Sequence, residues 1–391
     1  MQSLLYLLAC VSFLARGVIA AEVLHEWVSL NYTWDEVHTY KSYIRNGKFI
    51  PENCILAGIN VDYDGKIYLT VPRWRPGVPA TLNVLNTEAN TLTPFPSWEI
   101  QEETDPSEKS LKNIQSMTID SKHNMWMVDV GRRNFFAADA KLTVNGPAAV
   151  RVYNLRNKQF IHTYFFPDDI VPYADSFLND IALDEVHSMA YFSDAWGRGA
   201  IIAYDFLHGR SRRYSGPSTG VDPAYVMVIN GVNYGNNTFT TPIDGLAVTS
   251  DGQALFYCAV QGTTLFRVST GVLRDWQSSD SAIDSAVESL GVKEPSDGMK
   301  YFQGQLFWGS LPSSSYSTLQ CDATAPVSAS DATSSPSDPI NMEWPDTFAV
   351  DLHTQQHLMV VTNGLDRYLT YAMDFTGATA NMRILRLPLH M

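Results

Sequence analysis

Charged side chains are scarce in this 391-residue sequence, and positive charge is nowhere concentrated. Asp, Glu, Lys and Arg together make up 17% of the residues, and the formal net charge is −14. No basic run is longer than the pairs Arg132-Arg133 and Arg212-Arg213. Nucleic-acid binding needs clustered positive charge to displace counterions from phosphates. The sequence therefore argues against a nucleic-acid partner, and its acidity indicates either plain solubility or a preference for cationic ligands.

Long hydrophobic runs are also lacking. The only marked run, residues 4–14, is too short to cross a bilayer and precedes small residues at the spacing of a signal-peptidase site. We predict a secretory signal at residues 1–20, cleaved after Ala20 or Ala21, and a secreted chain from residue 21 to 391 with no membrane span. Two N-glycosylation sequons, at Asn31 and Asn236, fit this location.

Cysteine is rare, with four residues in the chain. Cys10 leaves with the predicted signal, so three remain. An oxidising compartment favours one disulfide and one leftover thiol. Cys258 and Cys321 each end or follow a repeated segment, so we predict that these two pair. Cys54 is then expected to be a free, buried thiol.

Familiar catalytic signatures are missing. The sequence contains no HExxH, CxxC pair, P-loop or GxSxG motif, and its nine His residues show no metal-ligand spacing. A triad assembled from distant residues stays open. No cofactor is predicted, and a small molecule is the expected partner.

What the chain does have is a repeated β-hairpin. Aromatics reach 12%, and 24 Gly and 20 Pro favour an all-β fold with many turns. Short alternating strands, each followed by a polar turn and a second apolar strand, recur six times, which is typical of a propeller or a solenoid rather than a β-sandwich. We predict a single six-bladed β-propeller over residues 21–391, closed by pairing of the N- and C-terminal strands. The repeats start at Ile59, Met117, Ile181, Leu246, Met299 and Phe348.

Polar residues precede five of the six repeats by two positions. In a propeller these positions gather at one mouth of the central channel, and clustered carboxylates need a cation, a proton or hydrogen-bond donors. The alternative is that each side chain only bonds the backbone of its own turn. The six residues are Ala57, Gln115, Asn179, Asp244, Asp297 and Asp346.

Several stretches, in this order, resemble the Yellow/major royal jelly protein family. They are VPRWRPGVPATLN, SFLNDIALDE, AYFSDAWGRGAIIAYDF, PIDGLAVTSDG, PSDGMKY and WPDTFAVD. The resemblance implies a secreted six-bladed propeller. Members of this family are variously linked to melanin pigmentation, credited with dopachrome conversion, or bind biogenic amines in the central channel.

The resemblance also implies ligand-binding residues. Amine-binding relatives use a Thr and an Asn that match Thr347 and Asn363, whereas an aromatic position nearby is Leu365 here. A bound ammonium is then expected to face Asp297 or Asp346.

Two alternatives to amine or catechol/indole binding remain. A dopachrome isomerase would use Asp244 or Asp297 as its general base. A calcium-dependent lactonase or esterase, by analogy with another six-bladed class, would bind metal through Asn179, Asp244 and Asp297. Ala57 stands where that class supplies a Glu ligand.

Overall fold

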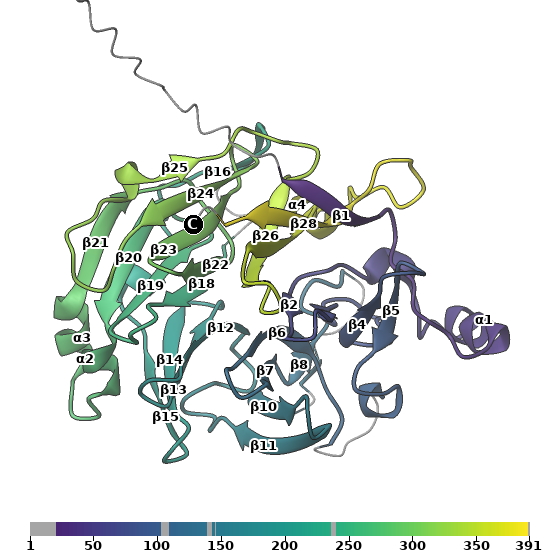
Figure 1. Cartoon of the computed structure of the whole chain (residues 1–391), viewed down its shortest axis with the longest axis horizontal. Coiled ribbons are helices and arrows are strands. Elements are labelled where there is room, and N and C mark those ends of the chain that lie inside the picture. Colours follow the sequence, from purple (N-terminus) through teal and green to yellow (C-terminus); the bar gives the residue numbers. More distant parts are fainter. Residues whose placement is uncertain (1–20, 103–108, 139–142, 145, 236–239, 390–391) are drawn as a thin grey trace, which may run out of the picture.

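Six four-stranded antiparallel sheets are arranged around a central axis in the computed structural model of the chain, as Figure 1 shows. The structure describes residues 21–102, 109–138, 143–144, 146–235 and 240–389. The fold is a six-bladed β-propeller, which confirms the fold class predicted from the repeats.

The innermost strand of every blade carries one of the six repeat starts. Neighbouring innermost strands contact one another in chain order, and the last contacts the first, so the ring is closed. They are β2 (Ile59–Val61), β6 (Ile114–Ile119), β12 (Leu178–Asp184), β18 (Ile243–Val248), β22 (Met299–Phe302) and β26 (Trp344–Val350).

Burial decreases from the second strand of a blade to its outer edge. In the second blade, β7 is wholly buried, whereas β11 is mostly exposed or half-buried. This gradient reflects the apolar runs that pack between blades. The second, third and fourth strands are, in the first blade, β3 (Ile67–Thr70), β4 (Leu82–Asn86) and β5 (Thr91–Pro94), and in the second blade, β7 (Asn124–Asp129), β10 (Ala149–Asn154) and β11 (Gln159–Phe165). In the third blade they are β13 (Met189–Asp194), β14 (Ala200–Asp205) and β15 (Arg210–Tyr214), and in the fourth blade, β19 (Ala254–Ala259), β20 (Thr264–Ser269) and β21 (Val287–Val292). In the fifth blade they are β23 (Gln305–Ser310), β24 (Ser315–Gln320) and β25 (Thr333–Ser334).

The sixth blade joins the two ends of the chain. Strand β1 (Glu22–Trp27) pairs with β28 (Met382–Pro388), which pairs with β27 (His357–Asn363) next to β26. Glu22 lies opposite Arg386, and the two side chains form an ion pair of 2.5 Å. The predicted closure by terminal strands is confirmed.

Helices are few and lie outside the sheets. Helix α1 (Val37–Arg45) precedes the first blade, α2 (Thr270–Arg274) and α3 (Asp280–Ala286) lie within the fourth blade's sequence, and α4 (Leu365–Leu369) follows β27. Two short ribbons are added to the ring: β8 (Arg132–Arg133) with β9 (Thr143–Val144), and β16 (Met227–Ile229) with β17 (Val232–Gly235).

The predicted Cys258–Cys321 disulfide is wrong for this structure: Cys54, Cys258 and Cys321 are all buried free thiols. The Cys258 thiol lies 3.2 Å from Ser296 Oγ, just before β22, whereas the Cys321 N–H donates to Gly304 O, just after β22. The two cysteines therefore lie at opposite ends of a four-residue strand, about 13 Å long. A disulfide needs Cα atoms within roughly 7 Å.

Evidence for secretion lies largely outside the described residues, because residues 1–20 and Asn236 are among those not described. Asn31 is exposed, and its Oδ1 accepts hydrogen bonds from the Tyr32 N–H and the Trp34 indole. Among the helices that the structure describes, none is long and apolar enough to cross a membrane.

Candidate functional site

The six residues that precede the repeats meet at the propeller axis. Ala57, Gln115, Asn179, Asp244, Asp297 and Asp346 all line one small cavity of about 10 Å³, which we call the neck of the channel. Ser116, Asp180, Gly298 and Thr347 complete its wall.

Hydrogen bonds between blades orient the carboxylates at the neck. Asn179 Nδ2 donates to Asp244 Oδ2 at 2.6 Å, and the Trp344 indole N–H donates to Asp297 Oδ2 at 2.6 Å. Both contacts join one blade to another, with partners 65 and 47 residues apart in the sequence. Asp244 and Asp297 therefore face the axis and do not fold back onto their own turns.

Glycine allows the strands to approach one another at this level. A Cβ atom on Gly245 would lie 2.4 Å from Asp297 O, and a Cβ atom on Gly298 would lie 2.4 Å from Asp346 O. The Asp-Gly pairs thus serve close backbone approach between blades rather than turn formation.

Burial and mutual repulsion raise the pKa values of the neck carboxyls. Burial is the largest cause for Asp244, followed by the negative charges of Asp297, Asp180 and Asp346. Burial likewise raises the pKa of Asp346 and brings that of Asp297 to about 7, although the Trp344 hydrogen bond opposes the second shift. The neck therefore retains protons near neutral pH or attracts a cation.

One end of the channel is narrow and capped by large side chains. At the N-terminal ends of the inner strands a cavity of about 50 Å³ remains beneath Trp74, Phe136, Phe177, Leu365 and Leu369. The Trp74 indole donates to Gln115 Oε1 at 3.0 Å. The PRWRPG segment therefore acts as a cap over the neck.

Arg75 secures this cap to the end of the chain. Its guanidinium lies 3.8 Å and 3.7 Å from the ring centroids of Tyr368 and Tyr371 and donates to Tyr368 O at 2.5 Å. Cation–π contacts that are shielded from water contribute roughly 2 kcal/mol. Residues almost 300 positions apart are thereby held together.

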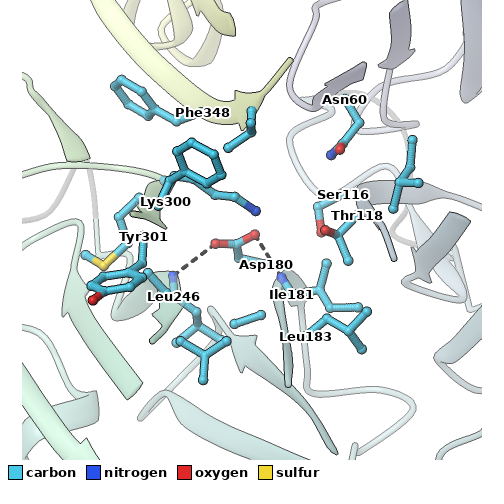
Figure 2. Close-up of a pocket in the computed structure, with 18 of the residues that line it drawn as sticks. Asn60, Ser116, Thr118, Asp180, Ile181, Leu183, Leu246, Lys300, Tyr301 and Phe348 are labelled. Carbon is cyan, nitrogen blue, oxygen red and sulfur yellow. Dashed lines mark hydrogen bonds between the residues drawn. The ribbon is translucent and has the colours of Figure 1, made fainter. Parts of the chain in front are cut away.

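The other end of the channel is wide. A cavity of about 270 Å³ lies among the C-terminal halves of the inner strands, and exposed residues Val186 and Ser250 stand among its lining, so it reaches the surface. Figure 2 shows its lining, with apolar and aromatic groups on one part and Asn60, Ser116 and Thr118 on another. The labelled apolar and aromatic residues are Ile181, Leu183, Leu246, Tyr301 and Phe348.

Asp180 lies where the wide cavity meets the neck, because it lines both. Its two carboxylate oxygens accept the N–H groups of Ile181 at 2.8 Å and Leu246 at 2.9 Å (Figure 2). Burial raises the pKa of Asp180 to about 6, although these two N–H donors and Lys300 partly oppose the rise.

Lys300 points into the same space from β22, with its amine directed toward the centre of the cavity in Figure 2. Burial lowers the pKa of this amine, and the charge of Asp180 opposes the shift. Within the described part of the chain, the Lys300 amine forms no hydrogen bond or ion pair. The wide cavity thus contains a carboxyl and an unpaired amine with opposite pKa shifts.

A family model, described as major royal jelly protein, matches residues 114–390. The chain belongs to the major royal jelly protein family. Protein yellow of Drosophila erecta is 29% identical over 268 residues, covering 64% of this chain and 48% of that protein; the Drosophila melanogaster protein is 28% identical over the same shares. This member of the family spans about half the length of the curated relatives it matches.

A solved structure supports the fold of this major royal jelly protein family member. Regucalcin of Agrobacterium tumefaciens, described as a calcium-binding protein, covers 94% of this chain, with 93% of its own chain aligned, at a TM-score of 0.50 and 10% identity. At that identity the likeness concerns the fold alone.

Thr347 and Asn363, the two residues that the family resemblance implies in ligand binding, lie in different surroundings. Thr347 lines both the neck and the wide cavity. Asn363 is buried: its Nδ2 donates to Leu56 O and to Asp346 Oδ2, both at 2.8 Å, and its Oδ1 accepts the Leu365 N–H at 3.0 Å. Both the Nδ2 and the Oδ1 of Asn363 are therefore used in hydrogen bonds within the protein, one of which orients Asp346.

Sequence reasoning missed Asp180 and Lys300. The available signal was a charged residue near the start of an inner strand, as in LNDIALD of β12 and MKYF of β22. Asp180 lies one position after the neck residue Asn179, and Lys300 lies three positions after the neck residue Asp297, so both lie farther along the channel than the six residues that precede the repeats.

The donor set at the neck does not fit a calcium ion. Asn179, Asp244 and Asp297 do lie together, but Asn179 turns its N–H toward Asp244, and Ala57 supplies no side-chain oxygen. Calcium takes roughly six to eight oxygen ligands. Among the described side chains, no group of three or more His, Cys, Asp or Glu residues is placed to hold a metal ion.

Proposed function

We propose that this chain is a secreted binding protein for a small cationic aromatic molecule, of the biogenic amine or catechol/indole type, and that the ligand occupies the wide cavity. The observation that carries the proposal is Asp180: a carboxylate fixed at the inner end of a cavity with apolar and aromatic walls. The mature chain would begin at residue 21 and form one propeller domain. Its link to pigment chemistry rests on the family.

Charge and shape both support this assignment. Asp180, with a pKa of about 6, is ionised at pH 7.5, and burial lowers the pKa of Lys300, so the inner end of the cavity favours a cation. An ammonium–carboxylate hydrogen bond contributes about 1.5–3 kcal/mol. Tyr301 and Phe348 offer ring contacts, and Thr347 offers a hydroxyl near the neck. The volume is close to the lower end of the roughly 300–1,000 Å³ typical of ligand sites.

Calorimetry with dopamine, serotonin and tyramine tests the proposal. We expect micromolar binding at pH 7.5, at least tenfold weaker binding to Asp180→Asn, and no change for the exposed control Asp35→Asn. Tyrosol, the neutral analogue of tyramine, should bind weakly. Because the pKa of Asp180 is about 6, affinity should fall as the pH drops below 6. Absence of heat at high micromolar ligand, or equal affinity for Asp180→Asn, would reject the proposal.

A second candidate is dopachrome isomerisation, favoured by the pKa values of about 6 for Asp180 and about 7 for Asp297. Carboxyls that titrate near neutrality are suited to accept and return a proton. In this scheme Asp244 and Asp297 would act at the neck. Spectrophotometric decay of dopachrome distinguishes the candidates: a rate equal to that in buffer leaves binding alone.

A further inference from the structure

Lys300 is half-buried and, unlike the buried Lys112 and Lys293, forms no hydrogen bond or ion pair with the described residues. Lys293 Nζ donates to Ser296 Oγ at 2.7 Å and to Glu294 O at 2.9 Å, and Lys112 Nζ donates to Ser110 Oγ. The Lys300 amine instead faces an open cavity, and the described residues offer it no hydrogen bond or ion pair. A desolvated amine without a partner is available to react.

The neighbouring groups suit one kind of reaction. Lys300 and Asp180 face the same space, and apolar residues such as Leu246 and Phe348 surround them. Other acidic groups of the lining have partners of their own: Asp184 pairs with His187 at 2.9 Å, and Glu185 accepts from Ser121 Oγ at 2.5 Å. Tyr301 donates to Cys321 O at 3.1 Å. Asp180 accepts hydrogen bonds from backbone N–H groups alone among the described residues and faces the same space as Lys300, so it is the carboxyl positioned to exchange a proton with a reacting group on Lys300.

We propose that Lys300 captures small aromatic aldehydes as an imine in the wide cavity. The amine nitrogen attacks the carbonyl carbon, forming a C–N bond and a carbinolamine. The Asp180 carboxyl donates a proton to the carbinolamine hydroxyl, which leaves as water while the C=N bond forms. The iminium proton returns to the Asp180 carboxylate. One amine and one aldehyde give one imine and one water, and no oxidant or reductant takes part.

Burial shifts the pKa values of Lys300 and Asp180 in the directions that imine formation needs. The lowered pKa of Lys300 raises the fraction of neutral amine near pH 7, and the raised pKa of Asp180 keeps a proton available near pH 6. The apolar wall favours an aldehyde with an aromatic ring, and a ring bound against that wall excludes water that would hydrolyse the imine. This activity goes beyond amine binding, because Lys300 and not Asp180 would form the bond to the ligand.

Reductive trapping on the full chain tests the proposal. The protein is incubated with 4-hydroxybenzaldehyde and sodium cyanoborohydride at pH 7, and modified lysines are located by peptide mass mapping. We expect Lys300 to be modified at least tenfold faster than the exposed residues Lys41, Lys66 and Lys158. Modification of Lys300 at or below the rate of these surface lysines overturns the proposal, and this comparison needs no variant.

Variants then separate reactivity from structure. Lys300→Met should abolish the fast modification, whereas the surface control Lys158→Met should retain it. Asp180→Asn should slow trapping at Lys300 and flatten the pH dependence of the trapping rate. An unchanged pH dependence would show that Asp180 takes no part in the reaction. Dopamine calorimetry on the same samples distinguishes this proposal from the preceding one: binding without trapping overturns only the imine, and trapping without binding overturns only the amine-binding function.

Discussion

At the scale of single residues, the most unusual feature is a set of carboxyls gathered from separate blades. Asp244, Asp297 and Asp346 are buried, and hydrogen-bond donors from Asn179, Trp344 and Asn363 hold their oxygens. These donors stabilise a shared arrangement but do not neutralise the charge. The buried set therefore couples folding to pH.

Stability should decrease from pH 5 to pH 8. The folded-state pKa of Asp297 is about 7, above its ordinary value of 3.8, so between these values the folded state binds a proton that the unfolded state has released. Each such carboxyl lowers the free energy of unfolding by up to about 1.4 kcal/mol per pH unit across that window. Urea unfolding at pH 5 and pH 7.5 measures the slope.

Asp297→Asn should flatten this slope, because its amide oxygen can still accept the Trp344 N–H while carrying no charge. The exposed substitution Asp35→Asn serves as the matched control and should leave the slope unchanged. A wild-type protein that becomes more stable between pH 5 and pH 7.5 would contradict the raised pKa.

At the scale of elements, the strands near the axis of a blade are more buried than its outer strand, as β7 and β11 of the second blade show. The segment 328–339 illustrates the limit of composition: its Ser and Pro content is typical of a surface loop, yet Thr333–Ser334 forms β25, the outer strand of the fifth blade. An edge strand of two residues needs no apolar pattern, because it buries little surface.

The sixth blade should be sensitive to changes in β28. Ile384 is fully buried there and lies opposite both His25 of β1 and Val361 of β27. Ile384→Ala should lower the free energy of unfolding by about 2–5 kcal/mol, because it leaves a cavity in the blade that closes the ring. Urea unfolding at pH 7 measures this loss.

Ile161→Ala provides the matched control. Ile161 lies in the outer strand β11 and is 48% exposed, so the same substitution removes much less buried surface. We expect a loss below about 1 kcal/mol. Equal losses at the two positions would contradict the closure of the ring through β28.

At the scale of the whole molecule, the ring is held by packing and hydrogen bonds between blades rather than by a disulfide. Alkylation under denaturing, non-reducing conditions should therefore label three thiols in a chain lacking residues 1–20, and a reductant should leave the melting temperature unchanged. Burial raises the pKa of Cys321 to about 11, which keeps that thiol protonated and slow to oxidise.

One labelled thiol together with a lower melting temperature in reductant would establish a disulfide instead. Such a result would require β22 and its flanking residues to lie differently from the structure, because Cys258 and Cys321 now flank opposite ends of that strand.

Much of the architecture was predictable because it is repeated. The alternating hairpins beginning at Ile59 and Phe348, with four between them, gave the blade number, and the strand-like tail gave the closure. The polar residues two positions before the repeats marked the neck, although the sequence left open whether they face the channel or bond their own turns. Asp244 and Asp297 are each followed by a glycine, and the pattern alone does not explain these two glycines. Their actual role depends on the distance from Gly245 to Asp297 O in the next blade, which no local pattern encodes.

By itself, the sequence determined the number of blades, the strands that close the ring and the residues that meet at the axis, since hairpin periodicity and strand direction suffice for these. Only the tertiary structure decided which end of the channel is wide, that Asp180 and Lys300 face one cavity, and that Cys258 and Cys321 are both free thiols. These features depend on side-chain directions and on distances between blades some 60 to 120 residues apart, and such distances exist only after the ring has closed.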